Sequence, residues 1–360
     1  MLRALLENRL NLLLAAVPIC WTMDALDADT SWIFLAASIS LVPLAGLIGL
    51  GTEHLAHRLG PASGGFLNAT FGNAAELIIA IVALGKGHVG LVKASITGSI
   101  VGNLLLVLGL SFFVGGLGRA FQKFHRTAAT NAAAMLVLAV IALVIPAVYD
   151  LALYGSLAPR PVAIDRLSLF SALILTVAYA GSLVYAFTAH RDLFRSSDGR
   201  DRGNAAGVSI AAAVACLAAG TLLTTIQAEI LVGAMAPALA RFGFTELFVG
   251  VVVIALVGNA AEHYSAVAAA RRDQMTLAVE IAVGSSAQIA LLVAPAVVVY
   301  SFLIGRPMTL LFNAMEITAI ALSVLSATLV VSDGESNWVE GLQLLAVYSI
   351  LALAFYFMPA

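Results

Sequence analysis

The chain has 360 residues, of which 61% are hydrophobic and only 11% are charged, and its mean hydropathy is +1.02. Soluble globular domains carry about 25% charged residues, so this composition excludes an ordinary soluble domain. The net charge of −2 provides no basic surface for a nucleic acid partner. The composition predicts an all-α polytopic membrane protein.

Apolar segments long enough to cross a hydrocarbon core of about 30 Å recur along the whole chain. The first, at residues 10–23, is shorter, and we expect it to be retained as an extra helix rather than removed as a signal sequence. The span at 205–230 is expected to continue into a short amphipathic stretch that ends near Arg241. Counting the first segment, the sequence predicts eleven transmembrane helices, and the other ten lie at residues 31–51, 64–85, 91–114, 128–148, 167–188, 205–230, 245–270, 275–302, 309–331 and 338–358.

The most polar stretch of the chain separates two halves of similar length. We expect residues 1–30 to form the extra helix and an acidic loop, 31–189 a first five-helix repeat, 190–204 a cytoplasmic linker, and 205–360 a second five-helix repeat. Lys and Arg are about twice as frequent in the segments that lie inside when the N-terminus is cytoplasmic. This charge bias places the N-terminus in the cytoplasm, and with eleven spans the C-terminus then lies outside. The Ala- and Arg-rich composition and the lack of a transit peptide favour the plasma (inner) membrane of a prokaryote.

One motif occurs twice and marks an internal repeat. The sequence GNAAE stands at residues 72–76 and again at 258–262, a separation of 186 residues, and the same separation relates the Gly-Ser pair at 98–99 to that at 284–285. The helices that carry the two motifs are the third and eighth predicted spans. These two spans are five positions apart in the order of spans, and because five is an odd number, the two helices cross the membrane in opposite directions. Inverted repeats of this kind place the site of many secondary transporters at the repeat interface near the midplane.

Each motif carries one carboxylate deep in an apolar span. Glu76 lies nine residues before Gly85 and Glu262 nine residues before Arg271, which corresponds to about 14 Å of helix. A charge near the bilayer centre costs roughly 2.5–3.5 kcal/mol, so a cation, a proton or a buried partner must neutralise it. Two inverted helices would bring two carboxylates to one divalent cation, and Ca²⁺ prefers six to eight oxygen ligands.

Several neighbours of the two acids carry oxygen atoms or lack a side chain. An amide precedes each acid by three residues, and the next helix of each repeat supplies hydroxyl and amide groups, while the glycines permit close helix approach or unwinding. The candidate cation- and proton-binding residues are Glu76, Glu262, Asn103, Gln288, Asn73, Asn259, Gly72, Gly258, Ser99 and Ser285, and the candidate metal ligands among them are Glu76 and Glu262. Residues that could serve cation access or have an accessory role are Glu53, Glu229, His263 and Glu280. The alternative interpretation is a helix-packing motif whose acid and amide are satisfied between helices.

The two blocks that begin GNAAELIIAIVALGKGHVG and GNAAEHYSAVAAARRDQM closely resemble the two repeats of the Ca²⁺/cation–proton antiporter (CAX) family, within the Ca²⁺/cation antiporter superfamily. The resemblance implies that Glu76 and Glu262 bind the cation and exchange protons, with Asn103 and Gln288 as further ligands. It also implies that the helices open at the Gly-Asn pairs of the two motifs. Sodium-coupled relatives carry Pro just before the acid, whereas this chain has Ala75 and Ala261, which favours proton coupling.

The expected function is secondary active transport, in which Ca²⁺ or a related cation is exchanged for H⁺ by alternating access at paired midplane glutamates. A sodium-coupled cation exchanger on the same fold is the first alternative, and a passive cation channel is the second. The residues do not distinguish among Ca²⁺, Mn²⁺ and Na⁺ as the transported cation. We expect no enzymatic activity and no cofactor beyond the transported Ca²⁺ and H⁺. The expected partners are these ions and the lipid bilayer, and a homo-oligomer is left open.

Overall fold

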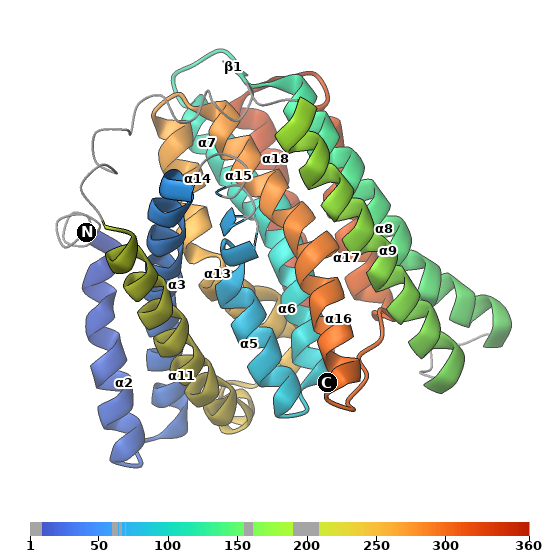
Figure 1. The fold of residues 1–360 in the computed structure, drawn as a ribbon. Coiled ribbons are helices and arrows are strands. Elements are labelled where there is room, and N and C mark those ends of the chain that lie inside the picture. The colour runs from blue at the N-terminus through green and yellow to red at the C-terminus, as the bar shows by residue number, and fades with distance from the viewer. Residues whose placement is uncertain are drawn as a thin grey trace. The chain divides into compact units, whose positions relative to one another are not determined.

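The computed structural model describes residues 9–59, 64, 67–68, 70–154, 161–189 and 209–359. The predicted linker at 190–204 lies outside these residues. The described chain is mostly helical (Figure 1) and contains eight helices long and apolar enough to cross a membrane. A ninth candidate span is a pair of helices bent by 61° between Glu246–Gly258 and Ala260–Arg271, and shorter apolar helices occupy Asn11–Ala25 and Ala74–Gly85. The protein is therefore a multi-pass helical membrane protein.

The helices and strands follow one another along the chain in the order shown by the colours of Figure 1. Up to residue 189 they are η1 (Arg9–Ala15), α2 (Ala16–Ala25), α3 (Thr30–Leu59), α5 (Ala74–Gly85), α6 (Val89–Val101), η2 (Gly102–Val107), α7 (Leu108–Gly116), β1 (Gln122–Lys123), α8 (Arg126–Tyr154) and α9 (Pro161–Ala189). The rest are α11 (Ile210–Phe242), α12 (Glu246–Phe248), η3 (Val249–Ile254), α13 (Ala255–Gly258), α14 (Ala260–Arg271), α15 (Met275–Gln288), η4 (Ile289–Val293), α16 (Ala294–Leu303), α17 (Ala314–Val331), β2 (Glu335–Ser336) and α18 (Trp338–Tyr356).

The chain divides into two compact units. The first comprises Met1–Lys86, Ala180–Phe244 and Val257–Ala261, and the second comprises Gly87–Tyr179, Thr245–Leu256 and Glu262–Ala360. Each unit draws on both halves of the sequence, so this division by contacts differs from the division into sequence repeats. The two units are described separately.

In the first unit, α3 and α11 pack along each other (Figure 1). Glycines set the close approach, since a Cβ atom on Gly51 would lie 2.8 Å from the backbone nitrogen of Leu217, and one on Gly220 would lie 3.0 Å from Ile48 Cγ1. Small residues have this role in membrane helix pairs because lipid offers no hydrophobic gain on association. The buried amide of Gln227 also donates to Ser40 Oγ at 2.5 Å, which links the two helices by a polar contact.

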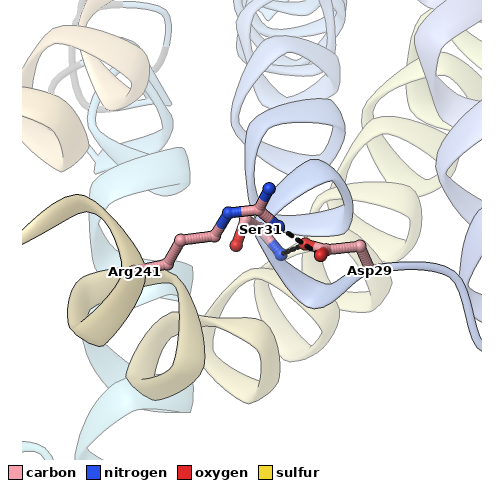
Figure 2. Close-up of polar contacts among 3 residues, drawn as sticks. All are labelled: Asp29, Ser31 and Arg241. Carbon is pink, nitrogen blue, oxygen red and sulfur yellow. Dashed lines mark hydrogen bonds and ion pairs between the residues drawn. The ribbon is translucent and has the colours of Figure 1, made fainter.

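An ion pair ties the end of α11 to the loop before α3 (Figure 2). Asp29 Oδ1 accepts the backbone N–H of Ser31 at 2.9 Å, and Asp29 Oδ2 pairs with Arg241 Nη1. The Ser31 N–H, with a further contribution from the Arg241 guanidinium, lowers the pKa of the Asp29 carboxyl. The expectation that this span continues into a stretch ending near Arg241 is confirmed, because α11 runs without a break to Phe242 and stops at Gly243, whose φ of 69° forms a left-handed cap.

The second unit holds two long helices, α6–η2–α7 and α15–η4–α16. Each is helical from end to end, and its middle segment, η2 or η4, is a π-helix between two α-helices. It also contains a small antiparallel sheet that the all-α expectation misses. Gln122 of β1 lies opposite Ser336 of β2, and Lys123 lies opposite Glu335, with 3.1 Å between Lys123 Nζ and Glu335 Oε1.

The predicted start of the span at 309–331 is wrong, because α17 begins at Ala314. Asn313 caps this helix, since its side chain accepts the N–H of Glu316 at 2.8 Å and the Glu316 carboxylate accepts the N–H of Asn313 at 2.9 Å. This reciprocal capping box defines a helix start. The apolar residues before it, including Leu310 and Phe312, are buried in a loop rather than in the helix.

Candidate cation-binding site

Both GNAAE motifs interrupt a helix, and the Asn of the motif lies in the break in each copy. In the first copy, Gly72 and Asn73 form a turn and α5 starts at Ala74, which places Glu76 in the first helical turn. In the second copy, α13 ends at Gly258, α14 starts at Ala260 and Glu262 lies in its first turn. The first N–H groups of a helix lack intrahelical partners and carry partial positive charge. Each carboxylate therefore sits where a negative charge is stabilised, and each break lies where the resemblance implies a helix opening.

Glu76 is buried in the first unit. Its side chain is only 7% exposed, and its Oε2 atom has no hydrogen-bond partner in the part of the chain that the structure describes. A buried carboxylate oxygen without a donor carries a desolvation cost that a bound cation or a proton would remove.

Gly258 of the second motif lies against this carboxylate. A Cβ atom on Gly258 would lie 3.2 Å from Glu76 Oε1 and 3.3 Å from Glu76 Cγ, so any larger residue would press on the acid. The amides of both motifs are also in the first unit, where Asn73 and Asn259 are fully buried. Residues of both motifs, as far as Ala261, thus belong to the same compact unit as Glu76.

The remaining candidate ligands belong to the second unit. Ser99, Asn103 and Ser285 are buried in their helices, while Gln288 and Glu262 are half-buried. Asn103 is the second residue of the π-helical segment η2, and Gln288 is the last residue before the π-helical segment η4. Single π-helical turns within α-helices occur frequently at functional sites.

These π-helical segments were not predicted from the sequence. They occupy matching places in the two repeats, since Val107 ends η2 and Val293, 186 residues later, ends η4. Ser286 was also missed. Its buried Oγ donates to Ala282 O at 3.0 Å and approaches Ile100 O at 3.4 Å.

The accessory residues are more exposed. Glu53 is exposed near the end of α3, His263 is half-buried in α14, and the Glu280 side chain is exposed on α15. Glu229 was predicted to serve cation access, but its Oε2 pairs with Lys86 Nζ at 3.0 Å, and the same ammonium donates to the Glu229 carbonyl at 2.7 Å. This pair stands beside a cavity of about 350 Å³ lined by Asp24, Thr30, Ile33, Lys86, Glu229, Ile230, Gly233 and Ala234.

Broken apolar helices that carry acids in their first turns are typical of one class of protein, the membrane transporters. The sequence profile of the sodium/calcium exchanger protein family matches residues 30–188 and 212–357. The chain belongs to the sodium/calcium exchanger family and is a transport protein rather than an enzyme.

Relatives match the chain from end to end. It is 40% identical to the Ca²⁺/H⁺ antiporter of Aphanothece halophytica, with 96% of each protein covered, and 38% identical to the Ca²⁺/H⁺ antiporter ChaA of Bacillus subtilis, with 97% of this chain and 99% of that relative covered. The solved structure of native YfkE has a TM-score of 0.83 at 38% identity and covers 97% of this chain and 100% of that one. The crystal structure of an H⁺/Ca²⁺ exchanger CAX, at 15% identity and a TM-score of 0.71 over 97% of this chain and 91% of that one, agrees in fold.

Proposed function

We propose that this protein exchanges Ca²⁺ for H⁺ across a membrane. The observation that carries the proposal is Glu76, a buried carboxylate at a helix break with one oxygen left without a donor in the described chain and with Gly258 of the second motif against it. The relatives named as Ca²⁺/H⁺ antiporters support the choice of ions.

The proposed architecture is one extra helix followed by two inverted five-helix repeats, residues 31–189 and 205–360, joined by a cytoplasmic linker at 190–204. The eight long apolar helices, the bent pair and the two shorter apolar helices agree with eleven spans in total. Matching π-helical segments in the two halves support the repeat. With the N-terminus cytoplasmic, the C-terminus is outside, and the bacterial relatives support a prokaryotic plasma membrane.

In the proposed site, Glu76 and Glu262 act together on one cation. The internal repeat supports the pairing, because each GNAAE motif supplies one of the two acids. The further oxygen ligands are Asn73, Asn259, Ser99, Ser285, Asn103 and Gln288, and Gly72 and Gly258 leave room for the cation. Ca²⁺ accepts six to eight such oxygens in flexible geometry.

Exchange follows from competition for the same two carboxylates. When both are ionised, they bind Ca²⁺, and when both are protonated, they are neutral. The empty, doubly charged pair is the costly state within the bilayer, because two like charges then lie together in a medium of low dielectric constant. If only the cation-loaded and protonated states can change between inward- and outward-facing forms, transport in one direction requires transport of the other ion in return.

The test uses purified protein in liposomes with an acidic interior and an alkaline exterior containing Ca²⁺. Proton-coupled exchange predicts Ca²⁺ uptake that an uncoupler abolishes. Uptake that depends on a sodium gradient and ignores the pH gradient would instead assign the sodium-coupled alternative. Movement of Ca²⁺ only down its own gradient would indicate a channel, and Mn²⁺ and Na⁺ are tested in the same way for cation choice.

A further inference from the structure

A second set of charged residues lies within the helices of the second unit and does not belong to either motif. Lys93 of α6 donates from Nζ to Leu311 O at 2.7 Å and to Thr309 Oγ1 at 3.2 Å, and it stands 5.9 Å from the centre of the Phe312 ring. Glu316 of α17 is only 3% exposed, and both of its carboxylate oxygens have hydrogen-bond partners within the protein. The charged ends of Lys93 and Glu316 are therefore both held by contacts inside the second unit.

The carboxylate of Glu316 also joins α17 to α6 by hydrogen bonds. Its Oε1 accepts the hydroxyl of Thr97 at 3.4 Å, and its Oε2 accepts the N–H of Asn313 at 2.9 Å. Thr97 is fully buried and stands one helical turn after Lys93. Two neighbouring turns of α6 are thus fixed to the loop before α17 and to its first turn.

Close packing against η3 also constrains the position of α6. Gly98, the residue after Thr97, packs so closely on the backbone of Val251 that a Cβ atom would overlap it, and Gly250 packs on Leu91 O, where a Cβ atom would lie 3.1 Å away. Ser99 follows immediately, and the π-helical segment with Asn103 begins one turn later. The helix is therefore held just before the two residues proposed as cation ligands.

The repeat provides no second copy of this pair. Lys93 lies in the first sequence repeat and Glu316 in the second, and their equivalents 186 residues away are Val279 and Thr130, neither of which is charged. The pair is therefore not a consequence of the repeat.

We propose that Lys93, Thr97 and Glu316 are positioning residues that fix the register of α6, so that Ser99 and Asn103 face the transported cation. The inference rests on the proposed function, because the effect is on the binding of that cation. Groups that orient the ligands of a metal ion change its affinity without touching it, and their loss typically lowers affinity about tenfold or more.

The experiment measures proton-driven Ca²⁺ uptake by Thr97→Val, which keeps the shape of the side chain and removes only its hydrogen bond. The expected result is a KM for Ca²⁺ raised about tenfold with a maximal rate close to that of the unaltered protein. Thr97→Ser, which keeps the hydroxyl, should restore the original KM. Glu316→Gln should raise KM as well, and Glu335→Gln, which breaks the exposed Lys123–Glu335 pair, serves as the matched control and should change nothing.

A purely structural role would lower the yield or thermal stability of folded protein and leave KM unchanged. An unchanged KM in folded Thr97→Val therefore overturns the inference, and this variant decides the question even if Glu316→Gln does not fold. Absence of Ca²⁺ uptake by the unaltered protein would contradict the proposed function, a result distinct from normal uptake with an unaffected Thr97→Val.

Discussion

Ser286 Oγ lies 3.4 Å from the carbonyl oxygen of Ile100, and the two residues are 186 positions apart, the same separation as the two GNAAE motifs. They therefore occupy one and the same position in the two sequence repeats. In a structure related to itself by a two-fold axis, equivalent residues can touch only close to that axis. The contact supports a pseudo-two-fold axis between α6 and α15, both in the second unit, as inverted repeats require.

The first prediction concerns this contact. Ser286→Val places two methyl groups where α6 and α15 meet, and we expect it to lower the free energy of unfolding by about 1–3 kcal/mol through overpacking. Thermal unfolding in detergent measures the effect. Ser286→Ala loses only a hydrogen bond, which within membrane proteins is worth about 0.6 kcal/mol on average. Equal stability of Ser286→Val and the unaltered protein would show that the two helices are not tightly packed here.

The second prediction compares two glycines at equivalent positions of the repeats. Gly98→Ala should destabilise the fold by about 1–3 kcal/mol or prevent folding, because the new Cβ atom would overlap the backbone of Val251. Gly284 has no atom within 4 Å of the corresponding Cβ position, so Gly284→Ala should be tolerated. The yield and thermal stability of the two purified variants provide the comparison. Similar behaviour of both variants would contradict the different packing at the two positions.

The third prediction concerns the glycine next to the candidate acid. Gly258→Ala adds a methyl group 3.2 Å from Glu76 Oε1, and we expect it to raise the KM for Ca²⁺ about tenfold by displacing the carboxylate. Gly46→Ala, at an α3 position with nothing within 4 Å, is the control and should transport normally. A Gly258→Ala variant with an unaltered KM would show that Glu76 does not bind the cation from this position.

The fourth prediction is a pH dependence of stability. The native pKa of Asp29 is lowered by the Ser31 N–H and by Arg241, so the carboxylate stabilises the fold above its unfolded pKa of about 3.9. This contribution is lost as the pH falls through the lowered native pKa. Asp29→Asn should therefore be less stable than the unaltered protein at neutral pH, and the difference should vanish in acid. A stability difference that stays constant from neutral pH to pH of about 3 would contradict this assignment.

The sequence predicted the membrane spans well where long apolar runs alone decide the structure. Eight predicted spans coincide with long apolar helices, and the family resemblance implied helix openings at the two GNAAE motifs, where the helices are broken. Errors occur where a particular contact decides the boundary. The start of α17 at Ala314, rather than at 309, depends on the capping box of Asn313.

Other features depended on contacts between residues far apart in the sequence. The pairing of Glu229 with Lys86 and the sheet between Gln122 and Ser336 join segments that no local pattern connects. The π-helical segments have the same apolar composition as the α-helices around them, so hydrophobic periodicity could not distinguish them. Ser286 lacked a signal as a single residue, although its equivalence to Ile100 follows from the repeat.

The central claim is that one buried acid serves both ions, and the most direct test is simultaneous measurement of Ca²⁺ influx and H⁺ efflux in liposomes containing Glu76→Gln. A glutamine cannot be ionised and cannot release a proton. The account predicts that both fluxes disappear together, while the protein remains folded and the control Glu335→Gln transports normally. Proton-coupled Ca²⁺ uptake by Glu76→Gln at the rate of the unaltered protein would contradict the account.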